Sequence, residues 1–189
     1  MDKPSSVGMR VEDLSGRGTI VAIGNFDGVH RGHQTVLADT ARESRGQHLD
    51  PIALTFEPHP TQAVGRPPPA CLTPVERKIE LIERVDPALR VVVQRFDEKF
   101  AALCPELFVR DVLVGQLQAC GVRVGENFRF GARRSGSLDT LIAFGQKLGF
   151  DAQAAPLLGD EHGRFSSTRA REAVACGDLQ AACAILSRP

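Results

Sequence analysis

The sequence contains no tryptophan or tyrosine, and neither acidic nor basic residues dominate it. Its 23 Lys and Arg residues equal its 23 Asp and Glu residues in number. Nucleic-acid-binding proteins usually present a basic surface and stack bases on aromatic side chains, so we expect no nucleic-acid partner. Any anion site in this chain must be built locally rather than by overall charge.

Long apolar runs are also missing from the start of the chain, where residues 1–18 are polar. We therefore expect neither a signal peptide nor a membrane span there, and no membrane partner. The five cysteines are odd in number and lack C-x-x-C spacing. This pattern favours reduced thiols in a cytoplasmic protein over a disulfide scaffold or a zinc site.

The 189 residues, of which 42% are hydrophobic, suit one globular domain of ordinary size. Strand-like apolar runs alternate with helical patterns, and a weaker strand candidate lies near 152–155. The pattern predicts an α/β fold in which a parallel sheet is covered by helices on both faces. The four stronger strand candidates are Thr19–Ile23, 51–56, 89–93 and 120–124.

Helices are expected between these strands, at 34–45, from 74 onward, at 105–117 and at about 138–148. The second has the clearest start: Thr73 as N-cap, a proline at the first helical position and the glutamate of a capping box. Val75, Ile79 and Ile82 should form its buried face. Two short helices close the chain, separated by Gly177-Asp178.

The most informative segment is the run G-N-F-D-G-V-H-R-G-H-Q at 24–34, which joins the first strand to the first helix. Amide groups and the positive end of a helix dipole favour phosphate at such a turn. His30 and His33 add donors that can follow charge developing on that phosphate. The alternatives are a surface pair or half of a metal site; only Asp27 and His59 are plausible further ligands, so we favour phosphate binding.

Two further segments follow predicted strands. Thr55-Phe56-Glu57-Pro58-His59-Pro60 ends the second strand, and is either a proline turn with an exposed histidine or part of the site. The loop 125–136 carries two phenylalanines around Arg129, and aromatic faces beside a polar amide suit a planar phosphorylated ligand. Its Arg133 and Arg134 are equally compatible with a solvated basic loop.

A fourth segment, Arg164-Phe165-Ser166-Ser167-Thr168-Arg169-Ala170-Arg171, opens a helix. One of its hydroxyl residues should cap that helix. Hydroxyls, unpaired amides and arginines together would also form a second cradle for a polyphosphate.

These four segments, in this order, resemble the FMN adenylyltransferase module of prokaryotic bifunctional riboflavin kinase/FAD synthetases. The resemblance extends from about Thr19 to the C-terminus. The H-x-G-H motif alone marks the wider nucleotidyltransferase superfamily. Its combination with T-F-E-P-H-P, G-E-N-F-R-F-G and S-S-T-R-A-R is much more specific.

The resemblance implies a Rossmann-like nucleotidyltransferase fold that converts FMN and ATP, with Mg²⁺ on the substrate phosphates, into FAD and pyrophosphate by direct in-line attack. It implies a catalytic role for His30, His33 and Arg164, and no metal ligands from the protein. The implied ATP-binding residues are Gly24, Asn25, Phe26, Asp27, Gly28, His30, Gly32, His33, Ser167, Thr168 and Arg171. The implied FMN-binding residues are His59, Asn127, Phe128 and Arg129.

On this basis residues 1–18 are an N-terminal extension and 19–186 the adenylyltransferase domain. The riboflavin kinase module is absent here and is expected only in a longer parent chain. Two alternatives remain open: a nucleotidyltransferase for another acceptor or for CTP, and a non-catalytic flavin- or nucleotide-binding module.

Two positions depart from the family pattern. Ala170 stands where a bulky aliphatic residue is usual, and Arg123 interrupts a normally more apolar strand.

Overall fold

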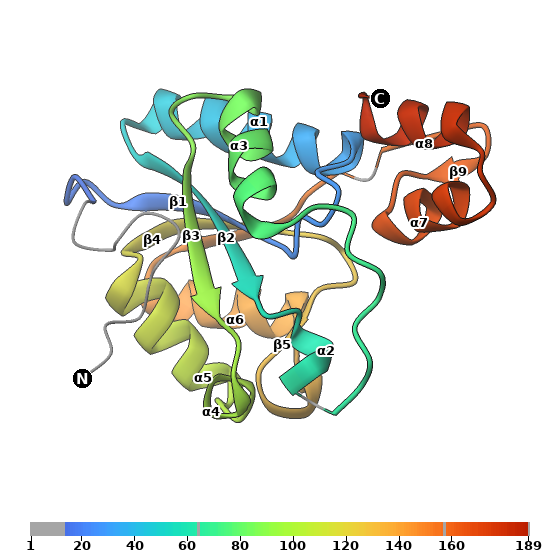
Figure 1. Ribbon diagram of the computed structural model, residues 1–189. Helices are drawn as coiled ribbons and strands as arrows, with labels where there is room; N and C mark the ends of the chain where they lie inside the picture. The colour runs from blue at the N-terminus through green and yellow to red at the C-terminus, as the bar shows by residue number, and fades with distance from the viewer. Residues whose placement is uncertain (1–13, 64, 157, 189) are drawn as a thin grey trace.

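The computed structural model describes residues 14–63, 65–156 and 158–188. Its centre is a five-stranded, entirely parallel sheet with the order β3-β2-β1-β4-β7 (Figure 1). The strands are β1 (Thr19–Ile23), β2 (Asp50–Glu57), β3 (Arg90–Arg95), β4 (Ala119–Val124) and β7 (Asp151–Ala154). All five predicted strands are therefore confirmed, with ends shifted by one or two residues.

Helices cover both faces of the sheet (Figure 1). Helices α1 (Arg31–Gln47) and α3 (Val75–Val85) pack on one face, where Ala22 and Ala53 leave room for them. Helices η2 (Phe108–Gln116) and α6 (Leu138–Leu148) pack on the other, against larger strand side chains such as Ile52. Because strand side chains alternate between faces, β1, β2 and β3 contribute residues to both cores, and the predicted two-sided α/β fold is confirmed.

Helix α1 begins three residues earlier than predicted. His30 is its N-cap, and its Nδ1 accepts a hydrogen bond from the amide of His33 at 3.3 Å. Histidine is not among the preferred N-cap residues, so its capping role is hard to recognise from sequence.

The predicted capping of α3 by Thr73 is wrong. Pro74 occupies the cap position without a side-chain hydrogen bond, and the Thr73 hydroxyl instead accepts from the Gly28 amide at 3.0 Å. The predicted buried face is confirmed in part: Ile82 is buried and Ile79 packs against the core, whereas Val75 does not belong to that cluster. The other buried residues of this helix are Lys78 and Leu81. Residues at i, i+3 and i+4 share a helix face, so the lysine lies on the buried side.

The third predicted helix, 105–117, is a short α5 (Pro105–Leu107) continued by η2, whose wider π-turns are seen in the bond from the Leu117 amide to the Val112 carbonyl. The fourth is confirmed as α6.

The two departures from the family pattern are accommodated. The guanidinium of Arg123, a buried residue on β4, pairs with Glu43 on α1 and, at 2.9 Å, with Asp151 on β7. Two carboxylates thus satisfy a charge that would otherwise be costly inside a sheet. Ala170 is fully buried beside Phe165 and Ile185, where its small side chain allows close packing.

The C-terminal helices α7 (Ser167–Ala175) and α8 (Leu179–Leu186) stand beyond one side of the sheet (Figure 1). Gly177, with a positive φ of 73°, separates them, and Asp178 caps α8 through the Ala181 amide, as predicted.

None of the helices in the part of the chain that the structure describes has the length and apolar character of a membrane span. The remaining elements are α2 (Pro60–Ala63), α4 (Glu98–Ala101), β5 (Arg129–Phe130), η3 (Ala132–Arg134), β6 (Gly136–Ser137), β8 (Gly159–Asp160) and β9 (Gly163–Arg164).

The predicted N-terminal extension lies largely outside the described residues, which begin at Leu14. Residues 14–18 lie against the sheet: Leu14 packs on the core and the Ser15 amide donates to Asp50 at 3.0 Å.

Candidate functional site

The candidate site lies at the carboxyl ends of the central strands, where ligands bind in open parallel sheets. A cavity of about 290 Å³ opens there between the β1–α1 loop, the loop after β4 and the segment after β7. It is lined by Ile23, Gly24, Phe26, His30, Gly32, His33, Val36, Gly125, Glu126, Asn127, Phe128, Ala155, Pro156, Leu158 and Phe165. The structure thus joins two predicted segments, the histidine motif and the loop with Asn127 and Phe128, in one cavity.

The two histidines of the motif form a stacked pair with ring centroids 3.5 Å apart. His30 is buried, whereas His33 is half-buried and meets the edge of Phe26 at 5.2 Å. Within the described chain, the buried Nδ1 of His33 has no hydrogen-bond partner. A buried polar atom without a partner is unusual and marks a place where a ligand or water completes the bonding.

Two glycines shape the turn that carries these rings. A Cβ at Gly32 would stand 3.2 Å from the His30 ring, so the glycine lets the imidazole fold back on the first turn of α1. Gly28 has a φ of +81°, and its amide is already bound to the Thr73 hydroxyl. Gly28 therefore supplies the left-handed turn, while its amide is engaged by Thr73; its predicted contact with ATP stays a prediction.

Both imidazoles are neutral near pH 7. Burial lowers the pKa of His30 to about 4. Burial, followed by the charges of His30 and Lys78, lowers the pKa of His33 well below its ordinary value. The neutral rings can still donate one N–H each, and a bound phosphate would favour their protonation.

The buried neutral His30 predicts acid sensitivity. Between its folded pKa of about 4 and its unfolded value near ~6.5, only the unfolded state binds the proton, so stability falls as pH decreases through this window. We expect about 2 kcal/mol of unfolding free energy to be lost between pH 7 and pH 5 from this group. Denaturant titrations at both pH values measure the loss.

The control is His30→Asn, which keeps a capping acceptor but does not titrate. This variant should lose less stability on acidification than the wild type. Equal losses in the two proteins would show that His30 is not the source.

Asp27 connects the histidine segment to the C-terminal helices. Its buried carboxylate accepts from the Leu72 and Thr73 amides at 3.0 Å and from Arg171 Nη2 at 2.6 Å. Its carbonyl accepts from the Ser167 hydroxyl at 2.8 Å. The two predicted phosphate cradles therefore lie side by side and share Asp27.

The residues of α7 differ in their contacts. Ser166 caps the helix through the Arg169 amide, which confirms that one hydroxyl residue of this segment is structural. Thr168 is exposed, whereas Arg171 is half-buried and occupied by Asp27 and the Ala70 carbonyl. Any phosphate contact by Arg171 requires its guanidinium to exchange or share these partners.

His59 reaches the site from the end of β2. Its Nε2 lies 3.3 Å from Asn25 Nδ2, and Thr55 on the same strand donates to the Asn25 carbonyl at 3.0 Å. The Asn25 turn is therefore fixed from the β2 side. His59 is not among the residues that line the 290 Å³ cavity, so it stands at the neighbouring side of the loop.

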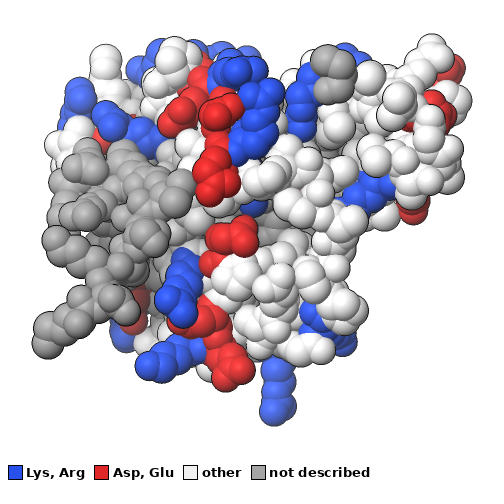
Figure 2. All heavy atoms as spheres, in the orientation of Figure 1, with Lys and Arg blue, Asp and Glu red and all other residues white. Residues whose placement is uncertain are grey.

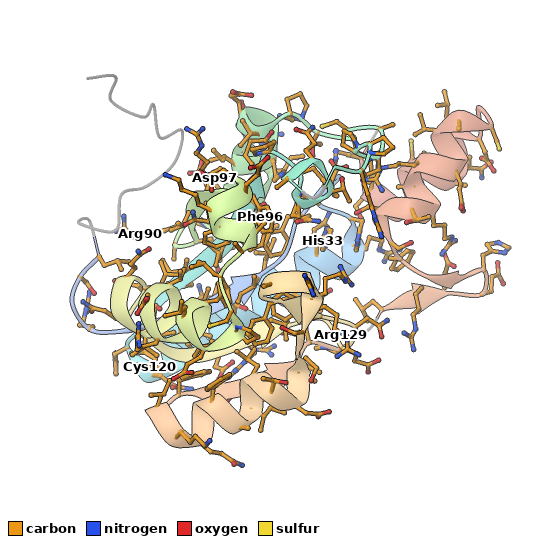
Figure 3. All side chains as sticks on the ribbon, turned by 90° about the horizontal axis from the view of Figure 1, so that it is seen from below. His33, Arg90, Phe96, Asp97, Cys120 and Arg129 are labelled. Atoms are coloured by element: carbon orange, nitrogen blue, oxygen red, sulfur yellow. The ribbon has the colours of Figure 1, made fainter. Side chains whose placement is uncertain are left out.

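Of the three residues predicted to bind FMN in the loop after β4, Asn127 and Phe128 line the cavity and Arg129 does not. Phe128 lines the cavity and also stacks on Phe130, with centroids 5.5 Å apart. Arg129, on β5, is exposed and lines a separate 60 Å³ space among phenylalanines rather than the cavity that contains His33; both residues are labelled in Figure 3. Arg164, also exposed, lies 3.8 Å from Glu126 and links the β9 strand to this loop.

No group of three or more His, Cys, Asp or Glu residues suited to a metal occurs within residues 14–63, 65–156 and 158–188. Acidic and basic side chains are mixed over the face shown in Figure 2. A larger groove of 750 Å³ lies between α1, α3 and α8, but it contains neither histidine of the motif.

Sequence reasoning missed two contributors to the site. Thr73 was assigned to helix capping, although it binds both Gly28 and Asp27. Lys78 was not considered, although its spacing of three and four residues from Leu81 and Ile82 was a signal that it shares their buried face.

Comparisons with known proteins agree with this geometry. A family model described as FAD synthetase matches residues 13–169. The bifunctional riboflavin kinase/FMN adenylyltransferase of Escherichia coli (strain K12) is 38% identical over 175 residues, covering 91% of this chain and 55% of that protein. The protein of the same description from Bacillus subtilis (strain 168) is 32% identical over 177 residues, covering 90% and 54%.

The chain thus spans about half the length of these curated relatives. Among solved structures, a crystal structure described as a macrolide-efflux protein from Streptococcus pneumoniae superposes with a TM-score of 0.80 at 24% identity. The match covers 95% of this chain and 59% of that one, and it supports the Rossmann-like α/β fold.

Proposed function

This chain belongs to the FAD synthetase family, and from that membership we propose that it transfers the adenylyl group of ATP to FMN. The products are FAD and pyrophosphate. One structural observation supports this proposal most: the histidine motif and the start of α7 meet at Asp27, so the two segments predicted to bind phosphate are adjacent. The predicted roles of His30, His33, Ser167, Thr168 and Arg171 in holding ATP are part of this proposal.

The reaction needs no nucleophile from the protein. An FMN phosphate oxygen attacks the α-phosphorus of ATP in line, a P–O bond forms, and the bond to the β-phosphate breaks with release of pyrophosphate. Aligning the two substrates can supply roughly 7–11 kcal/mol, and each well-placed donor about 3–4 kcal/mol. In this proposal the imidazole N–H groups and Arg164 and Arg171 neutralise charge that develops on the phosphates.

The flavin side is assigned to the β4–β5 loop and to His59. Phe128 borders both the histidine cavity and the phenylalanine cluster, so a planar ring held against it would bring its phosphate towards the histidines. Asn127 lines the same cavity and offers an amide to that phosphate. In this proposal Arg129 contacts the flavin only if the ligand extends into the 60 Å³ space lined by phenylalanines.

Magnesium fits this site only as a companion of the substrate. Asp27, the buried carboxylate beside the histidines, is already bound by Arg171 and two amides. We propose that Mg²⁺ enters on the phosphates of ATP, since Mg²⁺ commonly binds through substrate phosphates rather than in an all-protein cage. There it would offset phosphate charge.

The test is incubation of the purified chain with FMN, ATP and Mg²⁺, with FAD and pyrophosphate quantified over time. Equal amounts of both products support the proposal. CTP in place of ATP, and riboflavin or other phosphorylated acceptors in place of FMN, are parallel reactions. Activity with another pair only, or binding of FMN and ATP without turnover, would replace the proposal by one of the two alternatives.

A further inference from the structure

Lys78 is a buried cation for which no carboxylate partner is found in the described part of the chain. The residue is 5% exposed and lies in the first turn of α3. Among the described residues, its Nζ has one long contact, 3.5 Å to the Thr55 hydroxyl, and takes part in no ion pair. An ammonium has three donors, and burying it without an opposite charge is unfavourable.

The ammonium is connected to the candidate site through Thr55. Thr55, its one contact, also donates to the Asn25 carbonyl, and Asn25 in turn lies beside His59. Burial lowers the pKa of both His33 and His59, and the positive charge of Lys78 adds to the lowering in each, as expected for an ammonium near both imidazoles. Lys78 therefore faces the junction of the histidine segment and the segment after β2.

The nearby acidic groups do not neutralise it. Asp27 is bound to Arg171 and the Thr73 amide, and Glu57 is exposed at the end of β2. Their charges act to raise the pKa of Lys78, yet burial outweighs them and the pKa of the lysine is lowered. Lys78 and Arg171 thus equal Asp27 and Glu57 in number, but Asp27 is paired with Arg171, and within the described residues neither carboxylate forms an ion pair with Lys78.

We propose that Lys78 is a phosphate-binding residue, and that a substrate phosphate bound over Asn25 and Thr55 is the counter-ion its ammonium lacks. This inference rests on the proposed function for the identity of the ligand, a phosphate of ATP or of FMN. An ammonium and a phosphate attract each other strongly at a partly buried position. Lys78 therefore adds to phosphate affinity even where the two groups interact through a shared hydrogen-bond network.

If Lys78 had only a structural role, replacing it would lower the melting temperature and leave the affinity for phosphate ligands unchanged. Methionine has a similar length and no charge, so Lys78→Met removes the burden of burying an ammonium while filling the same space. We therefore expect the variant to melt at the same temperature as the wild type or higher. Its affinity for the phosphate ligand should nevertheless fall about 10- to 100-fold.

The experiment compares wild type, Lys78→Met, Lys78→Arg and the matched control Lys147→Met, an exposed position on α6. Melting temperature is measured, together with calorimetric binding of ATP, FMN and inorganic tripolyphosphate in separate titrations. Weaker ATP and tripolyphosphate binding assigns Lys78 to the ATP phosphates; weaker FMN binding alone assigns it to the FMN phosphate. Arginine should restore part of the affinity, and Lys147→Met should match wild type.

The inference is overturned if Lys78→Met binds all three ligands as wild type does. It is equally overturned if the variant melts well below wild type and arginine restores the melting temperature without restoring binding. A wild-type protein that binds ATP but forms no FAD would reject the proposed function alone, since the binding titrations still test Lys78.

Discussion

Replacing His33 with alanine should lower kcat for FAD formation by about 10²- to 10³-fold, the effect of removing one preorganised donor to a developing charge. The His33 ring lies over His30, borders the 290 Å³ cavity and has a buried Nδ1 without a partner in the described chain. The fold should persist, because the ring is only half-buried and α1 keeps its cap at His30. Single-turnover rates at saturating ATP and FMN measure the loss, and circular dichroism checks the fold.

A matched control is His162→Ala, which removes an exposed imidazole from the turn between β8 and β9. Its rate should equal that of the wild type. FAD formation at the normal rate by His33→Ala would remove this histidine from the mechanism, whatever its effect on stability.

Replacing Asp27 with alanine should lower the free energy of unfolding by about 3–5 kcal/mol, the range for breaking a buried ion pair from one side. The Asp27 and Arg171 side chains are 9% and 18% exposed, and the Leu72 and Thr73 amides would lose the same acceptor. Because Asp27 holds α7 against the β1–α1 loop, hydrogen exchange in α7 and α8 should accelerate more than in the sheet. Denaturant unfolding and exchange rates measure both effects.

Asp39→Ala is the comparison, since Asp39 pairs with Arg42 on the exposed side of α1. An exposed pair of this kind contributes about 0–1 kcal/mol. If Asp27→Ala were no more destabilising than Asp39→Ala, the connection between the two phosphate segments would not depend on this carboxylate. A double-mutant cycle with Arg171→Ala isolates the pairwise energy.

Much of the site could be predicted because the chemistry is concentrated in short segments that follow strands. In a parallel sheet the carboxyl ends of all strands meet at one edge, so the strand pattern alone placed His30, Asn127 and His59 at that edge. The order of the strands, however, needs long-range pairing, and only the structure shows β1 between β2 and β4.

Where prediction failed, one reason was a partner distant in sequence. Thr73 has the sequence context of a helix cap. Its hydroxyl instead accepts from the Gly28 amide and donates to the Asp27 carboxylate, both more than 40 residues earlier in the chain. The start of α1 was missed for a different, local reason: it depends on the His30 imidazole acting as a cap for the His33 amide, which cap preferences do not anticipate.

The sequence by itself determined the alternation of strands and helices, the two-sided α/β class and the family, because these follow from hydrophobic periodicity and from contiguous motifs. Only the tertiary structure decided that the histidine segment and α7 share Asp27 and that both imidazoles are held neutral. It also decided that Lys78 is buried without a paired carboxylate in the part of the chain that the structure describes. These features depend on how deeply a side chain is buried and on which charges the fold brings near it. A local stretch of sequence determines neither of them.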